Sequence, residues 1–443
     1  MRTLRRVQPS LPLPQVPHKH AQLLARMAQV LDSLPQMHQQ VLADLVRPGT
    51  RADFGRGGLA AEQVLRILVL YLMLKGDFEQ LEFHLCDSPT YRSFCLLGLG
   101  EVAPKRSTLH DNISRIRPQT LQTLHKILVE HAVLSGLESG TAVRTDTTPV
   151  AAWMRPPTDS ALLGDAVRVL LRLLKKAQKL VPMSVPDHSR RVLYRTTALR
   201  SQRLEPAQRE ALYFDLLQDT KGYVEAALFA AQFLEGCPGT AAYVLSLQLR
   251  TQAEGALCIV DQTERRVLQH EQVPAQAKRV SIFETHADIL RKREEVVYGH
   301  KVSLSFGKTG VVLAAQVLRG NPADSTLAVP ALLQVKDNTG KTPHDAAMDG
   351  GFASKANVTA LKELGVQRVA FNKGKGIDGE AACGNRRIRR KLYRFRAGVE
   401  GLISWLKRSL AMGQSRWKGA EGFHAYVWGV VMTASLQAIA RAR

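Results

Sequence analysis

The sequence is poor in cysteine and in acidic residues. It contains five cysteines in 443 residues, and no two of them form a Cys-x-x-Cys pair. This number and scatter exclude a disulfide framework, disfavour a structural zinc site and indicate reduced thiols in a cytosolic protein. Acidic residues number 39 against 61 lysines and arginines, which leaves a net charge of +22. So large a surplus calls for a polyanionic partner: ribosomal-type binding, DNA processing and attachment to an anionic membrane remain open.

The sequence also lacks a long uninterrupted apolar run. The first 17 residues are basic and carry prolines where a secretory signal needs an apolar core. The most apolar stretch, residues 423–440, is short and contains His424, Ser435 and Gln437, which favours a buried helix over a membrane span. We therefore expect a cytoplasmic protein that is neither exported nor bound to a membrane.

Positive charge is concentrated near the C-terminus. Residues 384–443 contain 13 lysines and arginines against Glu400 and Glu421, so this segment carries half of the net charge. A basic run of this kind is often a solvated helix face, but it is also the pattern of an anion-binding surface. The choice between the two depends on how the side chains are arranged within the run.

Helical patterns dominate residues 1–137, which we assign to an all-α N-terminal domain. Residues 1–50 indicate a lightly structured arm followed by one helix, and apolar residues then recur at helical spacing. Residues 107–116 predict a helix with Ser107 as its N-cap. Arg106 and Arg115 would contact DNA if this helix is the second of a helix-turn-helix, although a helix that merely packs fits the pattern equally well.

Strand patterns begin after residue 137 and are interrupted by a long helical segment. We predict strands at 141–150, 296–306, 311–318, 346–348 and 366–371, and helices at 324–335 and 354–364. Pro149 indicates that the first strand ends early or bulges. Residues 138–160 and 280–443 then form an α/β domain with a mixed sheet, and residues 161–279 form a mainly helical insertion between its first two strands. The apolar stripe at 163–174 is expected to be the core of this insertion.

A helix in the basic tail places four functional side chains on one stripe. Tyr393, Arg396, Glu400 and Lys407 are offset by 0, 3, 7 and 14 residues. At 100° per residue this set spans no more than about 60° of the helix surface. The apolar residues of the segment form the adjoining stripe, so one face docks on a core and the next presents an acid among cations. Taken alone, Glu400 between its two cations would usually be a salt bridge.

Two aspartates can join Glu400 in one site. Asp146 lies in or at the end of the first strand, and Asp349 ends a short apolar strand and precedes two glycines. Either one alone is more often a turn residue or a helix cap. Three acids presented by two strands and a basic helix are instead the ligand set that two divalent cations need. Mg²⁺ prefers carboxylate oxygens, and two such ions catalyse in-line phosphoryl transfer.

The tail helix resembles a known family. The spacing Tyr393-x₂-Arg396-x₃-Glu400-x₆-Lys407 matches the Tyr-Arg-Glu-Lys signature of bacterial insertion-sequence DDE transposases. From about Glu62 to the C-terminus the chain resembles the ISNCY group of those enzymes. The stretches that carry this resemblance are Arg144-Thr-Asp-Thr-Thr148, Pro157-Thr-Asp-Ser160, Leu162-Leu-Gly-Asp165, Ser281-Ile-Phe-Glu284, Tyr298-Gly-His-Lys301, Asp349-Gly-Gly-Phe352, Phe395-Arg-Ala-Gly-Val-Glu400, Trp417-Lys-Gly419 and Ala425-Tyr-Val-Trp428.

The resemblance implies a ribonuclease H-like catalytic domain whose catalytic, metal-binding triad is Asp146, Asp349 and Glu400. It implies two Mg²⁺ ions, for which Mn²⁺ can substitute. The implied reaction cuts double-stranded DNA at terminal inverted repeats and joins the freed 3′-hydroxyl to target DNA. The implied protein is bacterial and associates with the nucleoid when bound to DNA. A homodimer in the DNA complex is expected, because two transposon ends are handled together.

The candidate DNA-binding residues extend beyond the triad. The resemblance implies that Tyr393, Arg396 and Lys407 hold phosphates near the cleaved end. The further candidates are Lys301, Arg408, Trp417, Lys418, Arg106 and Arg115. Trp417 is the aromatic residue best placed to stack on an unpaired base. Two alternatives to a working transposase stay open: a metal-dependent nuclease that never joins DNA, and a decayed transposase that binds DNA without cutting it.

Overall fold

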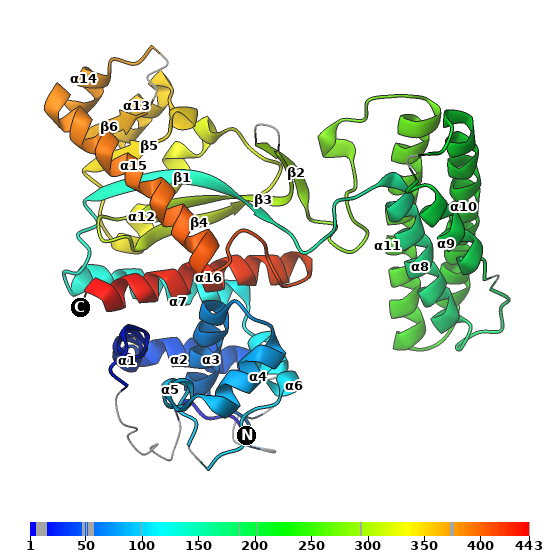
Figure 1. The fold of residues 1–443 in the computed structure, drawn as a ribbon, viewed down its shortest axis with the longest axis horizontal. Coiled ribbons are helices and arrows are strands. Elements are labelled where there is room, and N and C mark those ends of the chain that lie inside the picture. The colour runs from blue at the N-terminus through cyan, green and yellow to red at the C-terminus, as the bar shows by residue number, and fades with distance from the viewer. Residues whose placement is uncertain are drawn as a thin grey trace. The chain divides into compact units, whose positions relative to one another are not determined.

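The computed structural model describes residues 1–5, 16–46, 49, 51, 57–98, 100–185, 187–201, 203–292, 295–372 and 376–442. It divides into two compact units, Met1–Trp153 with His300–Arg443, and Met154–Gly299 (Figure 1). Most of the expected N-terminal arm, residues 6–15, lies outside the described residues. The N-terminal helices and most of the sheet fall in one unit, and the other unit extends beyond residues 161–279 at both ends. The division into three domains stays a prediction.

Helices fill the described chain before the first strand. They are α1 (Lys19–Asp32), α2 (Pro35–Leu45), α3 (Ala61–Leu74), α4 (Phe78–Asp87), α5 (Pro89–Phe94), α6 (Arg106–Ile113) and α7 (Pro118–Leu134). The expectation of one helix before residue 50 is wrong. Pro35 starts a second helix, at a position where the missing N–H of proline costs nothing. The cap expected at Ser107 is also wrong, because α6 begins at Arg106 with Lys105 as its N-cap.

The sheet is mixed and has six strands, in the order β2-β3-β1-β5-β6 with β4 also paired to β3. Besides β2 (Asp288–Lys292), its strands are β1 (Ala142–Ala151), β3 (Glu295–Phe306), β4 (Val312–Leu318), β5 (Asp345–Met348) and β6 (Arg368–Phe371), which confirms the five predicted strands. β3 and β4 pair antiparallel, whereas β1, β5 and β6 pair parallel. In the parallel pair of β1 and β5, Ala142 lies opposite Asp345 and Thr145 lies opposite Met348.

Two details of the strands differ from expectation. β1 continues through Pro149 to Ala151, so the early end expected there is wrong, while the alternative of a bulge stays a prediction. The pairing of β1 with β5 ends at Thr145, and the missing N–H of Pro149 therefore breaks no bond to that strand. The sequence also does not predict β2 (Asp288–Lys292), a short charged strand of the second unit that pairs antiparallel with the first five residues of β3.

The long basic helix α15 (Arg386–Ser409) lies against the strands that lead to the predicted site. It contacts β1, β5 and β6, and it crosses in front of the sheet in Figure 1. Leu392, Val399 and Leu406 of its predicted apolar stripe are buried. α12 (Ala328–Thr339) contacts β4, while α13 (Lys355–Glu363) and α14 (Gly379–Cys383) contact β6. The prediction that one face of α15 docks on a core is confirmed.

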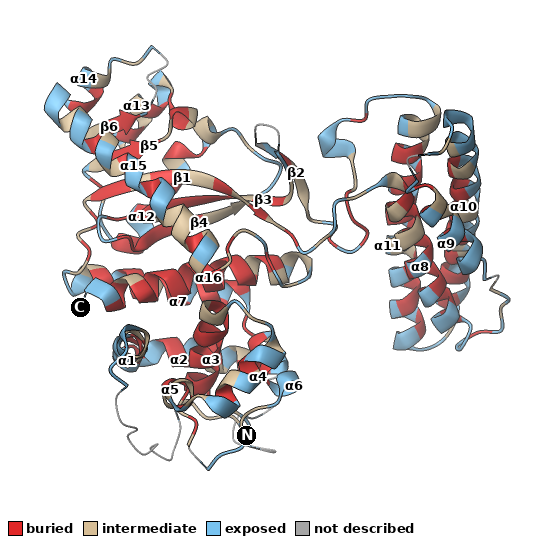
Figure 2. Ribbon diagram, in the orientation of Figure 1, coloured by how far each residue is buried: buried red, intermediate tan, exposed pale blue. Residues whose placement is uncertain are grey.

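The helix α16 (Gly419–Ala442) is the central helix of the first unit. It contacts α1, α3, α7 and β4, and it is buried along most of its length (Figure 2). Among the described residues it is the one helix long and apolar enough to cross a membrane, and 94% of its most apolar window is buried inside the protein. Its apolar residues on all sides are therefore explained by burial in the core, as the sequence predicted.

His125 of α7 connects the helices with the sheet. It is buried, and its Nε2–H donates to the Val312 carbonyl oxygen of β4 over 2.7 Å. Burial lowers the pKa of His125 to about 4, although the bond to Val312 acts in the opposite direction. The imidazole is therefore neutral at neutral pH, and acid has to charge it in the core.

Acid should destabilise the first unit partly through His125. The folded-state pKa of about 4 lies below the ordinary value of 6.5. The stabilisation that the neutral, buried His125 imidazole provides is therefore complete above pH 6.5 and is lost as the pH falls towards 4. Between about pH 7.5 and pH 4.5, the free energy of unfolding of wild type should fall by roughly 2 kcal/mol more than that of His125→Gln. Urea unfolding of both proteins measures this difference. Equal losses of unfolding free energy in the two proteins would contradict the assignment of this pH dependence to His125.

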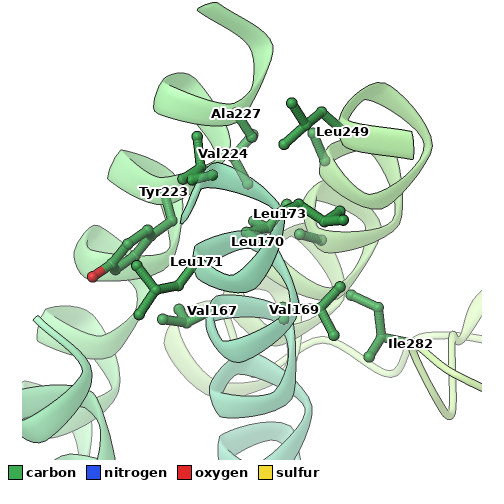
Figure 3. Packing of buried hydrophobic residues seen from close by; sticks show 14 of the residues in the cluster. Val167, Val169, Leu170, Leu171, Leu173, Tyr223, Val224, Ala227, Leu249 and Ile282 are labelled. Atoms are coloured by element: carbon green, nitrogen blue, oxygen red, sulfur yellow. The ribbon is translucent and has the colours of Figure 1, made fainter. Parts of the chain in front are cut away.

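The second unit is a helical bundle with its own core. Its main helices are α8 (Asp159–Ala177), α9 (Ser189–Ala198), α10 (Pro206–Glu235) and α11 (Thr240–Thr263), and α8 contacts the other three. Figure 3 shows Val167, Leu170 and Leu171 of α8 together with Val224 of α10 and Leu249 of α11, all members of one buried apolar cluster. The apolar stripe of α8 is thus the core of this bundle, as predicted.

Candidate active site

The three predicted catalytic acids come from two parallel strands and one helix. Thr145 of β1 pairs with Met348 of β5, so the residues that follow them, Asp146 and Asp349, stand next to each other where the pairing ends. The carboxyl ends of parallel strands are a common place for sites in α/β sheets. Helix α15 contacts both strands and supplies Glu400.

Arg396 joins the three acids. Its Nη2 atom lies 3.3 Å from Asp146 Oδ2 and 3.0 Å from Asp349 Oδ1, and its Nη1 atom lies 3.0 Å from Glu400 Oε1. The side chains of Arg396 and Asp146 are 11% and 16% exposed, against 39% for Asp349 and 69% for Glu400. One guanidinium therefore offsets part of the repulsion among three carboxylates, and the site opens to solvent on the side of Glu400.

The Asp146 carboxyl has a perturbed pKa. Burial raises this pKa above its ordinary value, and the charges of Asp349 and Asp324 act in the same direction. The Thr147 N–H, which donates to Asp146 Oδ1 over 2.8 Å, and the Arg396 charge both act against this shift. A partly buried acid whose pKa is shifted by burial and by neighbouring charges is typical of functional sites.

The donor chemistry of the triad fits a divalent cation. Three carboxylates supply the oxygen ligands that Mg²⁺ and Mn²⁺ prefer. Their present arrangement is not that of a metal site, because within the described part of the chain no three Asp, Glu, His or Cys side chains are grouped closely enough to hold an ion. The Arg396 guanidinium instead contacts an oxygen of each of the three acids.

A fourth acid, Asp324, borders the triad. Its Oδ1 accepts hydrogen bonds from Thr147 Oγ1 and Lys301 Nζ, both over 3.2 Å. A Cβ added to Gly351 would come within 2.7 Å of Asp324 Oδ2, so the second glycine after Asp349 makes room for this carboxylate. The sequence shows Asp324 as the opening of a helix and gives no sign of its place in the site. Lys301 is thus paired with an acid beside the triad, and its contact with DNA stays a prediction.

Arg144 fixes the position of α15 on β1. Its Nη1 donates to the Phe395 carbonyl oxygen over 3.0 Å, and its guanidinium lies 4.6 Å from the centre of the Phe395 ring. A Cβ added to Gly398 would overlap Arg144 Nη1, so any larger residue there would displace the guanidinium. Arg144 precedes Asp146 by two residues, and Gly398 precedes Glu400 by two. The contact between Arg144 and α15 therefore helps to fix the separation of Asp146 and Glu400. The sequence motifs that contain Arg144 and Gly398 give no sign of this contact.

Gly398 should be energetically coupled to Arg144. Alanine in a helix interior usually stabilises by about 1 kcal/mol relative to glycine, but here its methyl group displaces a held guanidinium. We expect Gly398→Ala to lower the free energy of unfolding by about 1 to 2 kcal/mol in wild type. In an Arg144→Ala background the same replacement should raise it. A double-mutant cycle in urea measures this coupling, and additive effects would count against the contact.

The other predicted phosphate ligands of the tail lie on or just after α15. Tyr393 Oη accepts a hydrogen bond from Arg389 Nε over 2.9 Å. Lys407 is partly buried, whereas Arg408 and Lys418 are exposed. The ring of Trp417 packs against two tyrosine rings, with centres 6.2 Å from Tyr71 and 5.9 Å from Tyr426. The roles of these residues in DNA binding stay predictions.

The two DNA-binding candidates among the N-terminal helices are in or next to α6, not on the tail helix α15. Arg106 opens α6 with an exposed side chain that pairs with Glu79 at 3.7 Å, and Arg115 follows α6 and is partly buried. Leu109 and Ile113 of α6 are buried, as the packing interpretation expects. The helix-turn-helix interpretation stays a prediction.

The N-terminal half of α15 presents a row of exposed cations. Arg386, Arg390 and Arg394 recur every four residues, and Arg387 and Lys391 are exposed beside them. Side chains four residues apart lie on the same side of a helix. The row occupies the same helix as Arg396 and Glu400, and it is the kind of surface to which a phosphate backbone binds.

Two family models match the chain. Residues 254–436 match the Transposase DDE domain, and residues 13–115 match the Transposase domain (DUF772). The first match includes Asp349 and Glu400, while Asp146 precedes it. No curated protein and no solved structure matches the chain. The chain therefore carries a transposase DDE domain and a second transposase domain, and these matches support, in general terms, a DNA transposase.

Proposed function

We propose that the chain is an insertion-sequence transposase of the ISNCY group. It cuts DNA at the terminal inverted repeats of its own element and joins the freed 3′-hydroxyls to target DNA. The observation that carries the proposal is the meeting of Asp146, Asp349 and Glu400 around Arg396. The mixed sheet with β1 at its centre and α15 across it supports a ribonuclease H-like catalytic domain.

The residues of the site divide into two groups by charge. Asp146, Asp349 and Glu400 are the residues that would hold Mg²⁺ or Mn²⁺. Such ions, when bound in pairs, activate the attacking oxygen and stabilise the leaving oxygen of an in-line displacement. Arg396 and the cations that precede it on α15 bind phosphates, which fixes the register of the DNA strand at the acids. Cleavage and joining then use one site, with water and a 3′-hydroxyl as the respective nucleophiles.

A cleavage and joining assay tests the proposal. The full chain, Mg²⁺ and a duplex that ends in the inverted repeats flanking the gene are expected to give nicks at the repeat end. With precleaved ends and a target plasmid, we expect covalent products, including concerted insertion of two ends if two copies act together. Cleavage that never leads to joining would favour a nuclease. Binding without either reaction would favour a decayed DNA-binding protein, and each of these results would contradict the proposal.

A further inference from the structure

We infer that Arg396 is a placeholder for the metal ions: it holds Asp146, Asp349 and Glu400 together in the free protein and has to leave them before a divalent cation binds. The inference rests on the proposed function, because it assigns the metal ions to the same three acids. It adds an order of events: a DNA phosphate first binds Arg396, and the three acids then bind the metal ion.

The contacts of Arg396 place it where a bound cation would act. Asp146 and Asp349 contact the same nitrogen, Nη2, at 3.3 Å and 3.0 Å, and Glu400 contacts Nη1 at 3.0 Å. Three carboxylates this close repel one another, and without a cation among them their side chains would separate. The guanidinium supplies that cation. A metal ion that binds the same oxygens competes with it for space and for charge.

In its position among the three acids, the Arg396 side chain lacks one hydrogen bond. Its Nε atom is buried and has no hydrogen-bond partner among the described residues. An unpaired buried donor costs free energy, which reduces the advantage of this position over an outward one. Glu400 lies one helical turn away and is 69% exposed, so the path from the acids to solvent is short. We expect the Arg396 side chain to reach solvent beside Glu400 by rotation about its own bonds, without any movement of α15.

DNA supplies the competing partner for Arg396. Arginine forms bidentate hydrogen bonds with phosphate, and these are stronger than bonds between neutral groups. The exposed arginines at 386, 390 and 394 lie on the same helix as Arg396, on another side of it, where they can bind neighbouring phosphates of the same DNA. A phosphate that binds Arg396 moves a positive charge away from the triad, so the affinity of the three acids for a divalent cation rises. By linkage, a bound cation strengthens DNA binding by the same factor.

Mn²⁺ binding to the full chain without DNA tests the inference. The signal of free Mn²⁺ in electron paramagnetic resonance gives the affinities of wild type, Arg396→Gln and Arg394→Gln. Arg394 is the matched control, an exposed arginine of the same helix two residues away. We expect Arg396→Gln to bind Mn²⁺ about 5- to 150-fold more tightly than wild type. Arg394→Gln should stay within roughly twofold, because exposed charges are screened.

Further variants decide what a change in Mn²⁺ affinity means. Adding Asp146→Asn to Arg396→Gln should remove the gain, which assigns the ion to the triad. Binding by Arg396→Gln that is no tighter than that of Arg394→Gln would overturn the inference, because Arg396 would then be a structural ion pair. If circular dichroism shows that Arg396→Gln does not fold, Arg396→Lys replaces it. One ammonium cannot span three acids, so a smaller gain is expected, and no gain would overturn the inference.

DNA affinity provides the reciprocal measurement. At constant ionic strength, Mn²⁺ should tighten the binding of a repeat-end duplex by wild type, and this gain should be absent in Arg396→Gln. An equal gain in both proteins would overturn the inference. Neither measurement uses cleavage. If Arg396→Gln binds Mn²⁺ more tightly but the wild-type chain never joins DNA, the placeholder role of Arg396 is supported and the proposed function is refuted.

Discussion

Replacement of Asp146 by asparagine is expected to reduce strand cleavage at least about 10³-fold. Asparagine keeps the shape of the side chain but loses the charge that a divalent cation requires. Metal ions contribute several kcal/mol of transition-state stabilisation, and each 1.36 kcal/mol is about tenfold in rate. Without divalent cations, duplex affinity should stay within roughly threefold of wild type, because DNA affinity then depends mainly on cations that contact phosphates.

Asp337→Asn is the control for this replacement. Asp337 lies on α12 in the same unit, and its exposed side chain pairs with Lys126 at 2.8 Å. The control removes one negative charge away from the triad and should leave cleavage unchanged. Single-turnover cleavage of a labelled end duplex, with binding measured in parallel, compares the three proteins. Cleavage by Asp146→Asn at the rate of Asp337→Asn would refute the role of the triad.

The affinity for duplex DNA is expected to depend steeply on salt through the cation row of α15. Each phosphate contact contributes about 0.9 to the slope of log affinity against log salt. Replacing Arg386, Arg390 and Arg394 together by glutamine should lower that slope by about 2 to 3. In low salt the affinity should fall by roughly 10- to 100-fold. Fluorescence anisotropy between about 50 and 200 mM salt measures both quantities.

Three lysines elsewhere in the first unit provide the matched control. Lys336, Lys341 and Lys355 are exposed and lie on or next to α12 and α13. Their joint replacement by glutamine removes the same charge, so a general effect of net charge should appear in both variants. A slope that falls equally in both would mean that α15 has no special part in DNA binding.

The elements of the first unit could be predicted because their patterns are local. Alternation of apolar and polar residues indicated β3, the turn after it indicated β4 as the return strand, and the 3.6-residue period of the tail indicated which side of α15 docks. The stripe of Tyr393, Arg396, Glu400 and Lys407 follows from helix geometry alone. For the same reason β2 was missed, since its five residues are too few and too charged to show a period.

The meeting of the acids depends on tertiary structure. Asp146 and Asp349 are neighbours because Thr145 pairs with Met348, and no local pattern encodes this parallel register. The contacts of Arg144 with Gly398 and of Asp324 with Lys301 likewise join distant segments. The sequence showed Arg396 as a neighbour of Glu400, but its bridge to both aspartates requires the sheet to be assembled first.

The central claim, that Asp146, Asp349 and Glu400 bind the same divalent ions, is tested most directly by iron-mediated cleavage of the polypeptide. Fe²⁺ replaces Mg²⁺ in the complex of the full chain with end duplex, and ascorbate with peroxide generates radicals that cut the backbone near the bound ion. We predict cuts beside residues 146, 349 and 400 that disappear in Asp146→Asn and in excess Mg²⁺. Cuts confined to other segments, or cuts that persist unchanged in Asp146→Asn, would contradict the claim.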